Sequence, residues 1–141
     1  MSKTSELVAF AKSCTEYKQI NYSTFSNMQA QNIGRITGVS IIGGIKVLDT
    51  NAIRHILKNH GNQEAETKKY ANQIAVTDND FELIPDILNT PDSVTRGKDG
   101  NRGKKALIFT KKFLNTYFLV MSISRNNSGV FVEVETLYIK N

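Results

Sequence analysis

The last third of the chain has the hydrophobic pattern of short β-strands separated by turns. Four apolar or alternating runs occur there, and Gly-, Asn- and Lys-rich turns separate them. The runs cover residues 93–97, 105–112, 115–124 and 130–140. Consecutive strands joined by tight turns predict an antiparallel meander.

Helical spacing of apolar residues marks the earlier part of the chain. Residues 4–14 carry an apolar stripe, and residues 50–62 carry a second one. In the second helix we expect Thr50 as the N-cap and Gly61 as a left-handed residue that ends it. Pro85 is expected to open a short helical segment over residues 85–89.

Three stretches between these elements carry weaker signals. Residues 63–74 predict a polar helix with a thin apolar side, formed by Ala65, Tyr70, Ala71 and Ile74. Residues 15–35 are rich in Ser, Thr, Asn and Gln, and predict a connector or docking segment. The apolar runs 36–42 and 45–49 flank Gly43-Gly44, which predicts a β-hairpin.

Helices first and a meander last predict an α+β fold. N-terminal helices would pack on a C-terminal antiparallel sheet of about four strands. At 141 residues the chain is expected to form one compact domain. Within it, residues 1–44 hold the first helix, the connector and the start of the hairpin, and residues 45–141 hold the rest.

The final strand decides which polar side chains share a face. Strict alternation puts Thr136 and Tyr138 on the side of Val130, Val132 and Val134. That valine side is the better core candidate. Glu133 would then point to the opposite side from Thr136.

Both histidines lie on the second predicted helix. Their five-residue spacing separates them around the helix, so His60 joins the apolar stripe and His55 faces outward. The spacing does not match H-x-x-x-H, and the single cysteine, Cys14, excludes a disulfide and a multi-cysteine metal site. We therefore expect no metal and no cofactor.

Composition and charge narrow the functional classes. The formal net charge is +5 and the pI is about 9.4, which favours an anionic partner such as nucleic acid. No apolar run approaches the roughly 20 residues of a membrane span, so no membrane partner is expected. The N-terminus lacks the features of a secretory signal, which predicts synthesis in the cytoplasm without an export signal of its own.

Most of the positive charge gathers in one predicted hairpin. Between residues 96 and 112 the sequence has several cations and only one carboxylate, Asp99, and these cations would contact phosphates. They are Arg96, Lys98, Arg102, Lys104, Lys105, Lys111 and Lys112. Cleaving RNA without a metal requires a base, an acid and cations, and histidine suits either proton role.

Four motifs follow one another along the chain: HILKNHGN, AVTDNDFELIPDILNTPDSV, the basic strand hairpin and VEVETLYIKN. Their order resembles the phage-type branch of the barnase–EndoU–colicin–RelE nuclease superfamily, and the resemblance covers roughly residues 45–141. Such domains occur in phage polyvalent proteins and as toxin modules of phage head-morphogenesis proteins.

The resemblance implies a helix–sheet fold and metal-independent RNA cleavage, often of tRNA. Our first hypothesis is that the 2′-hydroxyl attacks and leaves a 2′,3′-cyclic phosphate. His60 and His55 match the helical histidines of the motif, and Thr136 and Tyr138 match its late-strand polar positions. Lys111 and Lys105 match its phosphate-contacting cations. The resemblance supplies no match for a catalytic glutamate.

Two alternatives to a nuclease stay open on the sequence. A non-catalytic phage or mobile-element protein could bind RNA or a host protein through the same basic face. A structural module could instead dock on a partner through residues 1–44. A toxin-like nuclease would also be expected to have a cognate immunity protein as a partner.

Overall fold

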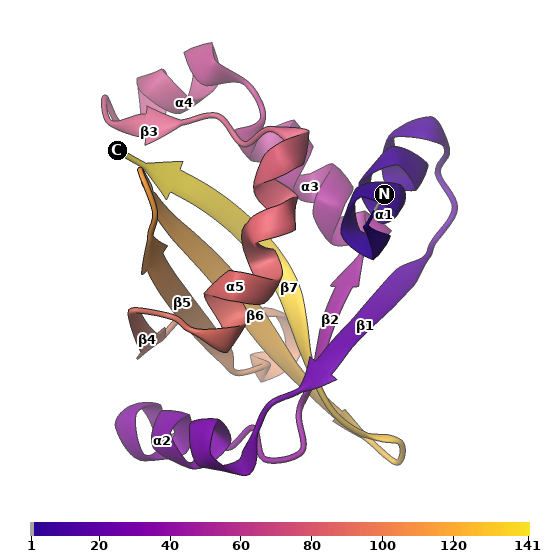
Figure 1. Ribbon diagram of the computed structural model, residues 1–141, viewed down its shortest axis with the longest axis vertical. Coiled ribbons are helices and arrows are strands. Elements are labelled where there is room, and N and C mark those ends of the chain that lie inside the picture. The colour runs from indigo at the N-terminus through magenta and orange to yellow at the C-terminus, as the bar shows by residue number, and fades with distance from the viewer. Residues whose placement is uncertain (1) are drawn as a thin grey trace.

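A computed structural model describes residues 2–141, in which helices cover one face of a β-sheet (Figure 1). Within these residues seven strands form one mixed sheet in the order β1-β2-β7-β6-β5-β4, with β3 also pairing with β7. The strands are β1 (Gln19–Thr24), β2 (Ile45–Asp49), β3 (Gln73–Ile74), β4 (Ser93–Arg96), β5 (Ala106–Lys112), β6 (Thr116–Asn126) and β7 (Gly129–Lys140). The helices are α1 (Lys3–Ser13), α2 (Asn27–Thr37), α3 (Thr50–His60), α4 (Gln63–Lys69), η1 (Asp78–Leu83), α5 (Ile84–Asn89) and η2 (Asn101–Gly103). The predicted α+β class and the antiparallel meander β4–β7 are confirmed.

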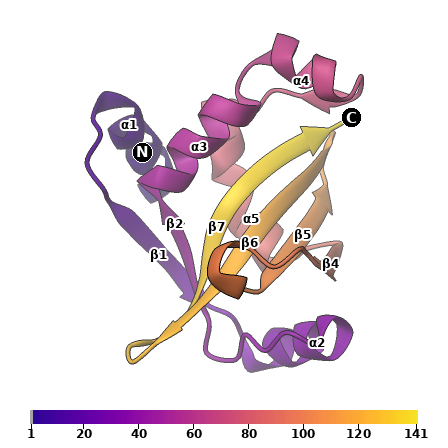
Figure 2. The same cartoon turned by 180° about the vertical axis from the view of Figure 1, so that it is seen from behind.

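The two faces of the meander differ in what covers them. The buried face of β6 (Tyr117, Leu119, Met121 and Ile123) joins one core with Ile53 and Ile56 of α3 and Ile84, Ile87 and Leu88 of α5. The opposite face, which we call the outer face, is crossed in Figure 2 by the β4–β5 connection and by no long helix. It carries Ala106, Ile108, Thr110 and Lys112 of β5, Thr116, Phe118, Val120 and Ser122 of β6, and Glu133, Thr136, Tyr138 and Lys140 of β7.

A β-bulge at Glu135 changes the alternation of β7. Val120 pairs with Thr136 while the next residue of β6, Met121, pairs with Val134. An extra residue in one strand inverts the faces that follow it. The buried residues are therefore Val132 and Val134 before the bulge and Leu137 and Ile139 after it. The expectation that Thr136 and Tyr138 share the valine side is wrong, and both lie with Glu133 on the outer face.

Helix α3 is confirmed, although its ends differ from expectation. Asp49 is the N-cap, because its Oδ1 accepts a hydrogen bond of 2.8 Å from the Ala52 amide. Gly61 has φ −92° and is not left-handed. A Cβ at Gly61 would lie 2.3 Å from the carbonyl oxygen of Leu57, so this helix end requires glycine for close backbone approach.

The predictions for residues 15–49 are wrong in two places. The polar segment 15–35 contains β1 and most of α2 instead of a connector. Residues 36–42 do not form a hairpin strand, because α2 continues to Thr37 and Gly38 ends it with φ 76°. The antiparallel partner of β2 is β1, whose polar sequence is tolerated because it lies at the edge of the sheet.

Helix α4 is shorter than predicted and buries a different residue. It ends at Lys69, and Ala65, Tyr70 and Ala71 are exposed. The residue it buries is Glu66. The short segment α5, with Pro85 in its first turn, is confirmed. No helix in residues 2–141 is long and apolar enough to cross a membrane.

Deleting Glu135 should destabilise the protein far more than truncating its side chain. Without the bulge, Leu137 and Ile139 would turn to the outer face, and each loses burial worth about 1.5–3 kcal/mol. We expect urea unfolding to show a loss of several kcal/mol for the deletion and less than about 0.5 kcal/mol for Glu135→Ala. Equal losses for the two variants would contradict the bulge.

Candidate functional site

The edge of β7 is interrupted where α3 passes along it. Strand β2 pairs with β7 in parallel at residues 131–133, and β3 pairs with it at residues 139–140. Helix α3 leaves the end of β2 and packs against β7. Its last residue, His60, is thereby brought to Tyr138, with the ring centroids 6.0 Å apart.

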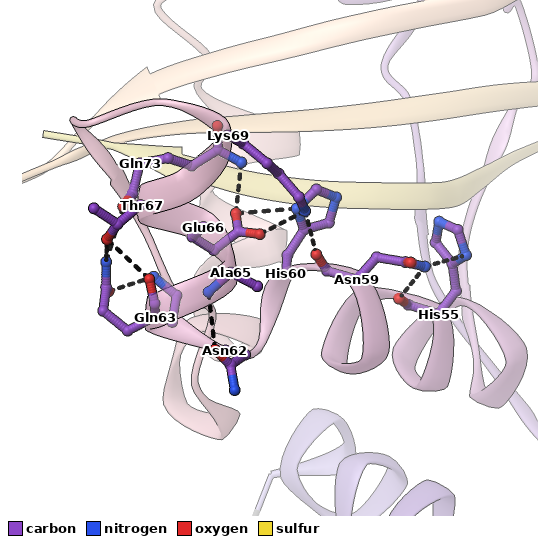
Figure 3. Close-up of polar contacts among 11 residues, drawn as sticks. His55, Asn59, His60, Asn62, Gln63, Ala65, Glu66, Thr67, Lys69 and Gln73 are labelled. Carbon is purple, nitrogen blue, oxygen red and sulfur yellow. Dashed lines mark hydrogen bonds and ion pairs between the residues drawn. The ribbon is translucent and has the colours of Figure 1, made fainter.

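His60 is held through one nitrogen by a buried carboxylate. Its Nδ1 lies 3.1 Å from Oε2 of Glu66 (Figure 3). An ionised carboxylate can only accept hydrogen bonds, so Nδ1 carries a proton and, in the neutral ring, Nε2 keeps its lone pair. The side chain of His60 is 16% exposed, whereas that of Glu66 is fully buried. This arrangement fixes both the tautomer and the orientation of the imidazole.

Glu66 is buried as an anion because three donors surround it. Its Oε1 accepts from Nζ of Lys69 at 2.7 Å, and its Oε2 accepts from Nε2 of Gln73 and from His60. Burial by itself raises the pKa of Glu66, but the hydrogen bonds from Lys69, Gln73 and His60 together outweigh it and lower that pKa. Since Lys69 also donates to the carbonyl of Asn59, the carboxylate ties α4 to the end of α3.

Tyr138 lies in a cluster of rings around one ammonium group. Its ring stacks on Phe118 with centroids 4.9 Å apart and an interplanar angle of 9°. Nζ of Lys140 lies 5.9 Å from the Tyr138 ring centroid. Burial and then the nearby Tyr70 raise the pKa of Tyr138. Its hydroxyl therefore stays protonated at neutral pH and can donate a hydrogen bond.

Thr136 lies two residues before Tyr138 on the same face. Its Oγ1 is buried, and among the described residues it has no hydrogen-bond partner. A buried hydroxyl without a partner costs about 1–3 kcal/mol. Thr136 is therefore a polar group that the fold leaves unsatisfied beside the histidine site.

His55 is exposed and has the opposite tautomer from His60. Nδ2 of Asn59 donates to His55 Nδ1 at 3.0 Å, so the proton of the neutral ring is on Nε2. In Figure 3 both imidazoles rise from α3 on the side along which β7 runs. The structure thus presents one ring nitrogen with a lone pair, on His60, and one with a proton, on His55.

The predicted cations separate into two groups. Lys112 lies on the outer face in one cross-strand row with Thr116 and Lys140, at the end that carries Tyr138. Lys111 points to the helix-bearing face with its partner Tyr117, and its Nζ donates to the carbonyl and hydroxyl oxygens of Thr90. The structure therefore does not bring Lys111 together with His60 and Tyr138.

The remaining cations lie on residues 97–105, which we call the basic loop, and on Arg96 before it. Arg96 and Lys105 bind Asp99 at 3.0 and 3.4 Å, and hydrogen bonding, first from Arg96, lowers the pKa of Asp99. Lys98, Arg102 and Lys104 are exposed. Figure 2 shows the loop in front of the sheet, and Lys104 lines a 210 Å³ hollow with Asp49 and Glu133. Ser122 of β6 also lines this hollow, and it lies four residues along the strand from Phe118, a distance of about 13 Å.

Two important residues of this site were missed by sequence reasoning. Glu66 lies outside the thin apolar side predicted for residues 63–74, and no pattern in the sequence singles out Lys140. The only signal for Glu66 is its position six residues after His60, beyond a helix break at Gly61. Among the described residues, no three His, Cys, Asp or Glu side chains are grouped so that they could hold a metal ion.

Comparison with known proteins identifies a family. Residues 23–141 match the family model described as phage-Barnase-EndoU-ColicinE5/D-RelE like nuclease3. The resemblance seen in the sequence motifs is thereby confirmed, and the match begins earlier than those motifs, within β1. Searches of curated proteins and of solved structures found no match to this chain.

Replacing Glu66 by glutamine should destabilise the protein at neutral pH and not in acid. The folded pKa of Glu66 is below its unfolded value of about 4.3, so its stabilisation is complete above that pH and is lost as the pH falls through the folded pKa. We expect Glu66→Gln to lower the free energy of unfolding at pH 7 by about 1.5–3 kcal/mol.

Urea unfolding from pH 7 to pH 3 measures this difference. The exposed Glu64 of the same helix is the control, and Glu64→Gln should cost less than about 0.5 kcal/mol. A Glu66→Gln deficit that stays constant down to pH 3 would contradict an ionised Glu66.

Thr136→Val should leave stability unchanged or raise it, by up to about 1 kcal/mol, because it replaces an unpartnered hydroxyl with a methyl group. Thr50→Val is the matched control. The buried hydroxyl of Thr50 accepts from the Lys18 amide at 3.0 Å and bonds the Glu16 carbonyl, so its loss should cost about 1–3 kcal/mol. Thermal unfolding of both variants tests this contrast, and a loss at Thr136 as large as that at Thr50 would refute it.

Proposed function

The chain belongs to the phage-Barnase-EndoU-ColicinE5/D-RelE like nuclease family, and from this premise we propose that it is a metal-independent RNA endonuclease. In the proposed reaction the 2′-oxygen of one nucleotide attacks the adjacent phosphorus and the bond from phosphorus to the 5′-oxygen breaks. The products are a 2′,3′-cyclic phosphate and a 5′-hydroxyl. This chemistry needs a base, an acid and positive charge at the phosphate.

One observation carries the proposal, namely the contact between His60 and the buried, ionised Glu66. With Nδ1 bound to Glu66, Nε2 of His60 can take the proton from the 2′-hydroxyl. The carboxylate then stabilises the imidazolium that forms, as an orienting carboxylate does for a catalytic histidine in other enzymes. His60 is accordingly the proposed general base.

His55 is the proposed general acid. It would act as the imidazolium, whose Nε2 proton passes to the departing 5′-oxygen and leaves a neutral ring. In that state the Asn59 amide would turn its oxygen toward Nδ1, which then donates. The Tyr138 hydroxyl and Thr136 are proposed to orient the phosphate by hydrogen bonds, which for Thr136 requires that RNA binding uncover an oxygen that is buried without a partner in the free protein.

The proposed cation at the reacting phosphate is Lys140, supported by its place beside Tyr138. It takes the role that the motifs suggested for Lys111, which faces the other side of the sheet. Flanking phosphates would contact Lys112, Arg96 and the basic loop with Lys98, Arg102, Lys104 and Lys105. A strand of RNA along the outer face would reach both groups of cations.

Transfer RNA is the proposed substrate to test first, and a toxin-like role would involve a cognate immunity protein. The second candidate function is RNA binding without cleavage, favoured by the exposed cations of the basic loop. It predicts salt-sensitive binding of RNA that stays intact on long incubation.

Purified protein should cleave total tRNA in EDTA, and His60→Ala should slow cleavage by about 10²–10⁴-fold because a positioned base contributes that much. Glu66→Gln should slow it as well, by up to about 10⁴-fold, because a carboxylate that orients a catalytic histidine can contribute that much. Product ends are identified by whether phosphatase removes the 3′-phosphate only after acid opens the cyclic ester.

Variants of Lys140 and Lys111 test which of these two lysines acts at the reacting phosphate. Lys140→Ala should reduce the cleavage rate strongly, whereas Lys111→Ala should leave it within about twofold, because Lys111 binds Thr90 on the other face. No cleavage by the folded wild-type protein, or full activity in His60→Ala, would overturn the nuclease proposal.

A further inference from the structure

Three aromatic rings surround the ammonium group of Lys140. Its Nζ lies 4.7 Å from the ring centroid of Tyr70, 5.7 Å from that of Phe118 and 5.9 Å from that of Tyr138. Phe118 and Tyr138 are direct partners on β6 and β7, and Tyr70 comes from the turn between α4 and β3. We call Tyr70, Phe118, Tyr138 and Lys140 the aromatic cluster.

This cluster is not part of the hydrophobic core. Tyr70 is 61% exposed, and Phe118 and Tyr138 are half-buried on the outer face. A single exposed tyrosine is ordinary on a protein surface. Three rings gathered about one cation, on a face that no long helix covers, have the composition of a surface that stacks nucleobases and holds phosphates.

The position of the cluster relates it to the proposed reaction. Tyr138 belongs to the cluster and also lies 6.0 Å from the His60 ring. One sugar joins a base to its own 2′-hydroxyl, so a base bound to the cluster would bring that hydroxyl to the imidazole. Lys140 would then lie between the base and the phosphate that follows it.

From this geometry we propose that the aromatic cluster binds one unpaired nucleobase, so that the enzyme cuts RNA only where the nucleotide before the cleaved bond is single-stranded. The proposal rests on the proposed nuclease function, which it makes specific. Bases inside a duplex have both faces covered by their neighbours and cannot stack on protein rings without leaving the helix. Stacking accepts every base, so the cluster distinguishes unpaired from paired nucleotides and not one base from another.

Binding, measured separately from cleavage, tests the cluster. The probe is a fluorescein-labelled single-stranded RNA hexamer, bound to His60→Ala protein so that it stays intact. Adding Tyr70→Ala should weaken binding by about five- to a hundredfold, the usual effect of removing one stacking ring. Tyr70→Phe keeps the ring and should bind within about twofold, and Met28→Ala, at a still more exposed side chain on α2, is the unrelated control.

An abasic hexamer series locates the base. Removing one base of the hexamer should weaken binding to the Tyr70-containing protein, and the same removal should matter much less once Tyr70→Ala is present. Because Tyr70 is exposed, its variant is expected to fold, and Phe118→Leu gives a second test within the sheet.

The outcomes distinguish this inference from the function on which it rests. Cleavage of duplex and single-stranded RNA at equal rates, with binding unaffected by Tyr70→Ala, would overturn the aromatic cluster and leave the nuclease standing. Ring-dependent binding of single strands without any cleavage by wild-type protein would support the cluster and overturn the nuclease. Preference for single strands in both cleavage and binding, lost in Tyr70→Ala, is the expected result.

Discussion

The bulge at Glu135 determines what both faces of β7 carry. By inserting one residue against β6, it turns Leu137 and Ile139 into the core and leaves Thr136, Tyr138 and Lys140 on the same side as Glu133. Without it, Leu137 and Ile139 would lie on the outer face, and Thr136, Tyr138 and Lys140 would face the core. The hydrophobic burial of the last strand and the polar composition of the candidate site therefore depend on the same local irregularity.

The second constraint is the buried carboxylate of Glu66. Burying an ion away from water costs free energy unless its hydrogen bonds are satisfied. Here a lysine, a glutamine and a histidine satisfy those of Glu66. These donors come from α4, β3 and α3, so one charge holds three elements together. The same bonds orient His60, so the Glu66 carboxylate contributes both to the stability of this region and to its proposed chemistry.

The sequence predicted the elements whose signals are local. Periodicity found α1, α3 and the four-strand meander, and motif order indicated the nuclease family. It failed where long-range contacts decide the structure. The polar strand β1 exists because β2 pairs with it, and Glu66 is buried because its donors come from both sides along the chain. Alternation along β5 puts Lys111 on the side of Leu107 and Phe109, whereas the motif match puts it at the phosphate, and the structure follows the alternation.

The location of the site follows from how the edge of β7 is shared. Strand β2 stops pairing with it after residue 133 and β3 resumes at residue 139, and the bulge lies between these two points. A continuous strand partner along this edge would leave α3 no place beside β7. Because the edge is interrupted, the end of α3 approaches the outer face and His60 meets Tyr138. The interruption that costs strand pairing is thus what allows a helix to contribute an imidazole to a sheet surface.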